Sequence, residues 1–233
     1  MLELKNLDAG YGRAQVLFGF ALSLRAGEVV ALLGRNGAGK STTLKAVMGL
    51  LEGVSGEVLF ENTSIKHLAP YQVARLGLGY VPEDRRIFTD LSVMENLEVG
   101  RQAPRAGAPY WTLEKLFELF PNLGRMRDRR GGSMSGGEQQ MLAIARTLMG
   151  NPSAVLLDEP FEGLAPLIVE GIAAAIRELR REGLSVLLCE QNLRHARRVA
   201  DAACIIEKGR LCYAGSLAAL EADTALRDRY LAL

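Results

Sequence analysis

The sequence predicts an α/β protein whose parallel sheet carries a phosphate-binding loop and whose core is interrupted by a helical insertion. Residues Gly34 to Thr42 read GRNGAGKST, which matches G-x-x-x-x-G-K-[ST], and they directly follow the apolar run Val29 to Leu33. A second apolar run, Ala154 to Leu157, ends in two carboxylates. Between residues 91 and 150 the strand patterns vanish and helical spacing takes over.

The composition favours one globular domain. The 233 residues are 48% hydrophobic, which is enough for one sizeable core. The formal net charge is +1, from 28 Lys+Arg against 27 Asp+Glu, so no global charge favours nucleic acid or an anionic membrane. Cys189, Cys204 and Cys212 form no C-x-x-C pair and lie in apolar segments, so we expect reduced core residues.

No stretch approaches the length of apolar sequence that a membrane-spanning helix needs, and the N-terminus lacks the basic start of a signal peptide. We therefore expect a soluble, cytoplasmic protein. Work at a membrane would require docking onto a membrane protein.

The glycine loop predicts polyphosphate binding. A strand that enters such a loop and continues as a helix directs several backbone N–H groups toward one point, and the helix N-terminus adds partial positive charge. Lys40 would reach the β- and γ-phosphates, the Ser41 hydroxyl would bind Mg²⁺, and Thr42 would add a phosphate contact. A simple connecting turn is the alternative, but the strand before the loop and a helical pattern over residues 42–51 favour the nucleotide site.

The N-terminal residues predict an antiparallel pair of strands. Residues 1–7 alternate apolar and polar, as an edge strand does, and residues 9–12 form a turn before a strand from Val16 to Leu24. That turn presents Tyr11, whose usual fate would be a half-buried position. With a phosphate loop downstream, stacking on adenine is the better interpretation.

The two carboxylates after the second apolar run predict magnesium binding and water activation. Adjacent residues on a strand point to opposite sides, so Asp158 and Glu159 would do different work. Asp158 suits the Mg²⁺ sphere, and Glu159 suits deprotonation of the water that attacks the γ-phosphate. Glu83 follows another short strand, Leu78 to Val81, whose end would open onto the same crevice. An acidic surface turn is the alternative at each place.

Ser135 to Glu138 precede an amphipathic helix and allow two interpretations. Ser135 as N-cap with Glu138 three residues later is a capping box that any helix could use. However, Gly136 and Gly137 are poor helix formers in a first turn, and N–H groups without a Cβ suit close approach to an anion.

The remaining segments predict helices, strands and a tail. Helical patterns cover 68–76, 93–99, 113–120, 141–149 and 167–181; strand patterns cover 55–60 and 184–188, a hairpin covers 205–212, and a helical tail covers 217–233. His195 is expected on an exposed helix face beside arginines, without a catalytic role, because a histidine needs a positioned partner. His67 is expected to have no role either.

The order of phosphate loop, SGGEQQ segment and LLDEP segment resembles the ATP-binding subunits of ABC transporters, over essentially all 233 residues. The resemblance implies a P-loop NTPase core with a parallel sheet, an N-terminal antiparallel β subdomain and an inserted helical subdomain. It implies a core at 1–83 and 152–215, a helical subdomain at 84–151 and a tail at 216–233. The nucleotide-binding residues would be Tyr11, Val16, Gly34, Asn36, Gly37, Ala38, Gly39, Lys40, Ser41, Thr42, Ser135, Gly136, Gly137 and Glu138; the metal ligands Ser41, Glu83 and Asp158; and the catalytic residues Glu159 and Gln191.

In this family two such domains dimerise head to tail around ATP. The resemblance therefore implies that the Ser135 to Gly137 segment of one chain contacts the γ-phosphate held by Lys40 of the other. The helical subdomain would carry the groove for a membrane subunit.

Narrower segments are similar to the smaller ATP-binding subunit of branched-chain amino-acid importers and of related amide and urea importers. These are YVPEDRRIF from Tyr80, SGGEQQMLAIA from Ser135, GLAP from Gly163 and CEQN from Cys189. The implied function is ATP hydrolysis that powers import of such solutes. The implied partners are a related second ATPase, permease subunits and, indirectly, a periplasmic binding protein. Lipid or polysaccharide export, or a soluble ABC protein acting on ribosomes or DNA, are the alternatives.

Four positions depart from the general family pattern. Glu83 stands where glutamine is usual, Gln191 stands in place of the switch histidine, and Phe161 and Ala165 replace the common Ser and Asp. Glu83 can still bind Mg²⁺, and Gln191 can still hydrogen-bond a γ-phosphate, although it cannot become cationic. A site that binds ATP well but hydrolyses it slowly remains an alternative.

Overall fold

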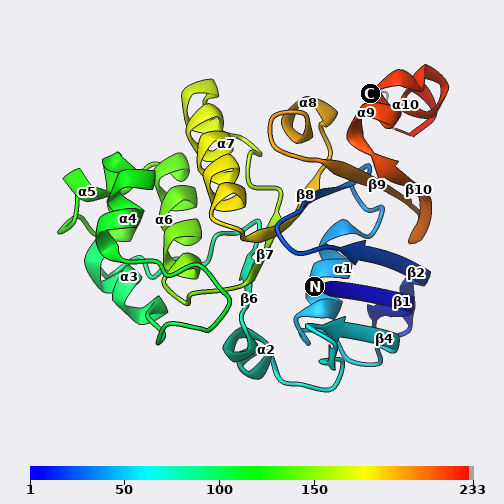
Figure 1. The fold of residues 1–233 in the computed structure, drawn as a ribbon, viewed down its shortest axis with the longest axis horizontal. Coiled ribbons are helices and arrows are strands. Elements are labelled where there is room, and N and C mark those ends of the chain that lie inside the picture. Colours follow the sequence, from blue (N-terminus) through cyan, green and yellow to red (C-terminus); the bar gives the residue numbers. More distant parts are fainter. Residues whose placement is uncertain (231–233) are drawn as a thin grey trace.

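The computed structural model describes residues 1–230 and confirms the α/β class. Figure 1 shows two sheets on one side of the molecule and a lobe of helices on the other. The central sheet has the strand order β10-β9-β3-β8-β7-β6, formed by Arg210–Ser216, Ala202–Glu207, Val29–Leu33, Ser185–Glu190, Ala154–Asp158 and Leu78–Val81. The strands from β9 to β6 run parallel, and β10 is antiparallel to β9.

The parallel register brings three strand ends together. Leu33, the last residue of β3, pairs with Glu190 at the end of β8, and Asp158 at the end of β7 pairs with Cys189. Every residue of β3, β7 and β8 is buried, as expected for strands covered on both faces. Because parallel sheets bind ligands beyond the carboxyl ends of their strands, this edge carries the candidate site.

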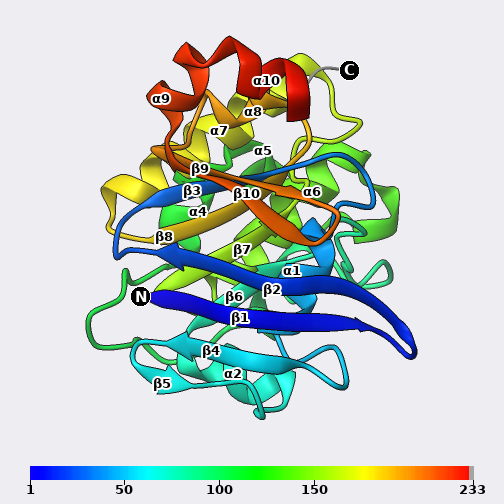
Figure 2. The ribbon, with the colours of Figure 1, turned by 90° about the vertical axis from the view of Figure 1, so that its right-hand side faces the viewer.

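The second sheet is antiparallel, with the order β2-β1-β4-β5 (Figure 2). Its strands are Ala14–Leu24, Leu2–Tyr11, Ser55–Phe60 and Thr63–Ser64. The expectation that the chain starts with an edge strand is wrong, because β1 lies between β2 and β4. Alternation of apolar and polar residues indicates that one face of a strand is buried. It does not indicate whether one or two neighbouring strands pair with the backbone.

Helix α1 (Lys40–Val47) follows the phosphate loop and packs on both sheets, in an apolar cluster that includes Leu44, Phe20 and Leu187. The helix is shorter than the expected residues 42–51. It ends where Gly49 takes a left-handed φ of +68°, and the Leu50 N–H donates to the Lys45 carbonyl.

The helical lobe lies beyond the opposite side of the central sheet (Figure 1). It contains α3 (Val93–Gly100), α4 (Leu113–Leu119), α5 (Pro121–Arg125), a 3₁₀ turn (Gly131–Ser133) and α6 (Gly136–Leu148). One apolar cluster runs from this lobe into α7 (Pro166–Arg181), and it includes Leu97, Leu142 and Ile172. The lobe is thus packed onto the core.

The remaining helices are α2 (Pro70–Leu76), α8 (Leu193–Ala196), α9 (Leu217–Ala222) and α10 (Thr224–Tyr230). The last part of the expected tail, residues 231–233, lies outside the described residues. None of the helices within residues 1–230 is long and apolar enough to cross a membrane.

Candidate nucleotide site

The phosphate loop has a backbone that needs glycine. Gly37 and Gly39 have φ angles of +78° and +117°, in the left-handed region. A Cβ on Gly39 would lie 2.9 Å from a methyl of Leu17, and a Cβ on Gly34 would lie 2.5 Å from the carbonyl oxygen of Ile206. The loop is therefore held tightly between β2 and β9.

Lys40 connects the loop to the end of β7. Its Nζ donates to the Gly34 carbonyl at 2.9 Å and lies 3.0 Å from Oε1 of Glu159. The two side chains are only 3% and 9% exposed. A phosphate in the loop needs a positive charge beside it, and the buried Lys40 ammonium lies in that position.

Asp158 lies beside the first turn of α1. Ser41 Oγ donates to Oδ1 of Asp158 at 3.0 Å, and the Tyr80 hydroxyl donates to Oδ2 at 3.4 Å. Burial raises the pKa of Asp158 to about 6, while the bond from Ser41 acts in the opposite direction. Burial and the nearby Asp158 also raise the pKa of Tyr80. The sequence analysis missed Tyr80, although its place near the end of β6 was a usable signal.

The Asp158 and Ser41 oxygens are hard donors of the kind that Mg²⁺ prefers. Within residues 1–230, no group of three or more His, Cys, Asp or Glu side chains forms a complete metal site. An incomplete protein shell fits Mg²⁺, since that ion keeps waters and takes phosphate oxygens as ligands.

Glu159 leaves the strand by a sharp change of backbone direction. Its φ is +47°, and its N–H donates to the Cys189 carbonyl at 3.1 Å. Its side chain meets Lys40, whereas the preceding Asp158 meets Ser41, so the two carboxylates face different partners. Their functional roles stay predictions. Glu162, which the sequence analysis missed, is hydrogen-bonded to Glu159, and this contact raises its pKa to about 6.

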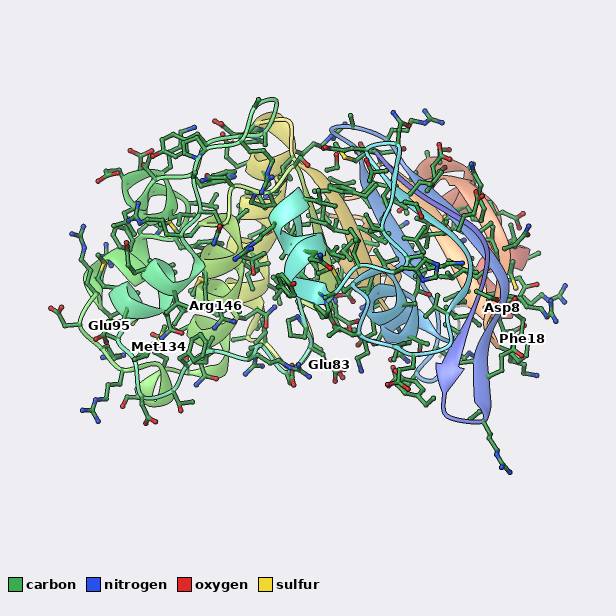
Figure 3. All side chains as sticks on the ribbon, turned by 90° about the horizontal axis from the view of Figure 1, so that it is seen from below. Asp8, Phe18, Glu83, Glu95, Met134 and Arg146 are labelled. Atoms are coloured by element: carbon green, nitrogen blue, oxygen red, sulfur yellow. The ribbon has the colours of Figure 1, made fainter. Side chains whose placement is uncertain are left out.

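A cavity of about 400 Å³ lies over the loop. Tyr11 is one of the residues that line it, with 47% of the residue exposed and its ring centroid 6.0 Å from the Lys45 ammonium, and its stacking on adenine stays a prediction. Glu83, exposed in the loop after β6, lies between the helical lobe and the α1 side of the molecule (Figure 3). The lining residues are Tyr11, Val16, Asn36, Gly37, Gly39, Lys40, Ser41, Thr42, Glu83, Glu159 and Glu162.

Some predicted residues do not line this cavity. Gly34 and Ala38 are buried parts of the loop, and Asp158 is linked to the cavity through Ser41. Gln191 lines a neighbouring cavity of about 780 Å³, which also includes Glu159.

Ser135 to Glu138 lie away from the cavity, at the start of α6 in the helical lobe. The local interpretation is confirmed: Ser135 Oγ accepts from the Glu138 N–H at 3.4 Å, and Glu138 accepts from the Ser135 N–H at 2.7 Å. A Cβ on Gly137 would lie 2.8 Å from Cγ2 of Ile168, and one on Gly136 would lie 2.8 Å from the Arg85 guanidinium. Close packing inside the chain is thus one reason for these glycines. Contact with a nucleotide on another chain stays a prediction.

Two expectations about side chains are wrong. His195 is half-buried, with Nδ1 lying 3.2 Å from Oε2 of Glu190, and so it does not lie on an exposed helix face. The short helix α8 turns His195 back toward the strand end, which helical spacing alone did not indicate. All three cysteines are free, but Cys212 is half-buried on the edge strand β10 and is not a core residue.

The glycine loop with its buried lysine and the adjacent serine–aspartate pair define a phosphate-loop ATP-binding protein. Residues 17–162 match the family model described as ABC transporter. The chain is 42% identical over 231 residues to "High-affinity branched-chain amino acid transport ATP-binding protein BraG" of Pseudomonas aeruginosa, covering 99% of both chains. It is 36% identical over 232 residues to "Lipopolysaccharide export system ATP-binding protein LptB" of Escherichia coli K12, covering 99% of this chain and 96% of the other.

Among solved structures, the nucleotide-free ATP-binding cassette of an ABC transporter has a TM-score of 0.82 and 26% identity, covering 97% of this chain and 96% of that one. The chain therefore belongs to the ABC transporter family as an ATP-binding subunit, and it is an ATPase. The expected ABC ATPase fold is confirmed by the same comparison.

Proposed function

We propose that this chain hydrolyses ATP to power an ABC importer for branched-chain amino acids or chemically similar small solutes. The observation that carries the proposal is the buried Lys40–Glu159 pair at 3.0 Å beside the phosphate loop, because it places a phosphate-binding cation and a candidate base together. The likeness to BraG over 99% of both chains supports the cargo class.

The residues divide the work as follows. The loop from Gly34 to Thr42 binds the phosphates and Tyr11 stacks on adenine. Ser41 and Asp158, with Glu83, hold Mg²⁺, which neutralises phosphate charge when bound. Glu159 accepts a proton from the attacking water, and Gln191 hydrogen-bonds the γ-phosphate through its amide.

A second ATPase subunit completes the site. Ser135, Gly136, Gly137 and Glu138 lie outside the cavity that contains Lys40, which supports their use on a partner's nucleotide. Ser135, the N-cap of α6, is exposed, and the N-terminus of a helix suits an anion that approaches from another chain. The partner is a related, distinct ATPase, and a homodimer is the alternative when the chain is alone. Permease subunits hold the pair at the inner face of the membrane, a periplasmic binding protein delivers the solute, and nucleic acid plays no part.

Lipid or polysaccharide export is the second candidate. The 36% identity to LptB favours it, because that relative also matches over nearly its full length. A soluble ABC ATPase on ribosomes or DNA has less support, since the net charge of +1 gives no global attraction to nucleic acid.

Transport by the reconstituted complex separates these candidates. The chain would be co-expressed with the permease and ATPase genes beside its own, purified as a complex and placed in proteoliposomes with a binding protein. We expect ATP-dependent uptake of labelled leucine, isoleucine or valine, and no uptake with Lys40→Ala. Stimulation of ATP hydrolysis by a lipid or lipopolysaccharide, without amino-acid uptake, would contradict the importer and support export.

A further inference from the structure

The end of β8 is joined by backbone hydrogen bonds to both sides of the nucleotide site. The Glu190 carbonyl accepts from the Gly34 N–H at 3.3 Å, at the start of the phosphate loop. The carbonyl of the preceding Cys189 accepts from the Glu159 N–H at 3.1 Å. A displacement of this strand end would therefore move the phosphate loop and Glu159 together.

The Glu190 side chain places a buried carboxylate at this end of β8. It is only 4% exposed, and its Oε1 has no hydrogen-bond partner among residues 1–230. Burial raises the pKa of Glu190, whereas the contact with His195 lowers it. Because an unpaired buried carboxylate is costly, the contact between Oε2 and His195 Nδ1 at 3.2 Å and a backbone hydrogen bond from Phe161 together hold this side chain.

The same imidazole packs on the loop that follows the candidate base. The ring centroids of His195 and Phe161 lie 5.2 Å apart with an interplanar angle of 57°. Phe161 is 1% exposed and follows Glu159 by two positions. The left-handed φ of +47° at Glu159 is strained for a residue with a side chain, and such a conformation persists only when its surroundings hold it.

His195 is itself held in place. Asn192 caps the short helix α8 by accepting from the Arg194 N–H at 2.9 Å, and Ala196 beside His195 is fully buried. His195, Glu159 and Gln191 line the same cavity of about 780 Å³. His195 thus contacts Glu190, which precedes Gln191, and Phe161, which follows Glu159. It does not line the nucleotide cavity over the phosphate loop.

We propose that His195 is a positioning residue for ATP hydrolysis: by pairing with Glu190 and packing on Phe161, it holds the two loops that carry Gln191 and Glu159. The inference rests on the proposed hydrolytic function of the site. A purely structural histidine would affect melting temperature and leave turnover of the folded protein unchanged.

The test compares variants of the full-length chain in complex with its partner subunits. We expect His195→Ala to lower kcat about tenfold, with KM and the affinity for a fluorescent ATP within twofold of wild type. His195→Gln keeps an N–H donor for Glu190 and should remain within about threefold of wild type. Arg194→Ala, on the exposed side of the same helix, should change neither value.

A double-mutant cycle identifies the route of the effect. Glu190→Gln removes the carboxylate that pairs with His195 and leaves the packing on Phe161, so His195→Ala added to it should lower kcat by only about threefold further. An undiminished tenfold loss in that background would overturn the inference, and so would wild-type kcat in a folded His195→Ala complex.

Lys40→Ala gives the background rate. If wild type does not exceed that background, the proposed function fails and the inference falls with it; if wild type exceeds it and the His195 variants match wild type, only the inference fails.

Discussion

Lys40 Nζ lies 3.0 Å from Glu159 Oε1, and both side chains are almost fully buried. Removing one member of a buried ion pair leaves the other charge without a partner. A substitution at either residue therefore destabilises the charge on the other. A phosphate bound in the loop would compete with Glu159 for the Lys40 ammonium, and the Glu159 carboxylate would then be free to contact the attacking water.

Replacement of Glu159 by Gln should stop hydrolysis while keeping ATP bound. The amide cannot accept a proton from water, and loss of a general base lowers rates by about 10² to 10⁴-fold. In the complex we expect an ATP-bound dimer of ATPase subunits that persists in gel filtration with light scattering. Glu162→Gln is the matched control, since Glu162 lines the same cavity and hydrogen-bonds Glu159. It should slow single-turnover hydrolysis less than tenfold; equal losses in both variants would contradict the assignment of Glu159 as the base.

Replacement of Lys40 by Ala should weaken nucleotide binding. A charge-assisted hydrogen bond contributes about 1.5–3 kcal/mol, so Kd for ATP should rise roughly tenfold to a hundredfold. Lys45→Ala, on the same helix and near the Tyr11 ring, should raise Kd less than fivefold. Fluorescent ATP titrations measure both. An unchanged Kd in Lys40→Ala would remove the phosphate-binding role from the loop.

The phosphate loop was predictable because its information is local. Glycines, lysine and hydroxyls follow one another on a single turn between a strand and a helix, so the motif specifies its own geometry. The same holds for the capping box at Ser135, which needs only Glu138 three positions later. The general α/β arrangement also followed from local periodicity and the order of segments.

The contacts between distant segments were not predictable in the same way. Ser41 and Asp158 are 117 positions apart, and their hydrogen bond depends on the order of strands in the sheet. The interior position of β1 in its sheet depends on backbone pairing, which the alternation of side chains does not indicate. His195 was assigned to an exposed face because its partner Glu190 precedes α8 and lies outside its helical pattern.

Replacement of Asp158 by Asn should stabilise the nucleotide-free chain at neutral pH. Burial raises the pKa of Asp158 from 3.8 to about 6, so between those values the folded state binds more protons than the unfolded state. The contribution of this group to the free energy of unfolding therefore falls as pH rises from about 4 to about 6. Asn cannot ionise, and its Oδ1 can still accept from Ser41.

Urea unfolding at two pH values checks this. At about 1.4 kcal/mol per pKa unit, Asp158→Asn should gain up to about 3 kcal/mol at pH 7 and less than about 1 kcal/mol at pH 4. Asp90→Asn, at an exposed position, should stay within about 0.5 kcal/mol of wild type at both values. The stabilised variant should lose hydrolysis, because the amide is a poor ligand for Mg²⁺. A gain of the same size at both pH values would show that ionisation of Asp158 is not the cause.

Replacement of Gly137 by Ala should lower turnover in the complex without affecting the chain's own nucleotide affinity. The added Cβ would lie 2.8 Å from Cγ2 of Ile168, so the first turn of α6 must shift away from α7. Gly137 does not line the cavity over Lys40, so fluorescent ATP should bind within twofold of wild type while kcat falls at least about tenfold.

The double variant Gly137→Ala with Ile168→Ala separates the two reasons for this glycine, because it removes the two side-chain atoms nearest to the new Cβ, Cγ2 and Cγ1 of Ile168. If close approach to a nucleotide on the partner is what requires glycine, the double variant stays at the low kcat, since the methyl group still blocks the anion from the N–H groups. Ile168→Ala alone serves as the control and should retain more than half of the wild-type kcat. Full recovery in the double variant would show that Gly137 serves only the packing of α6 on α7, and the composite site would then have to be sought elsewhere.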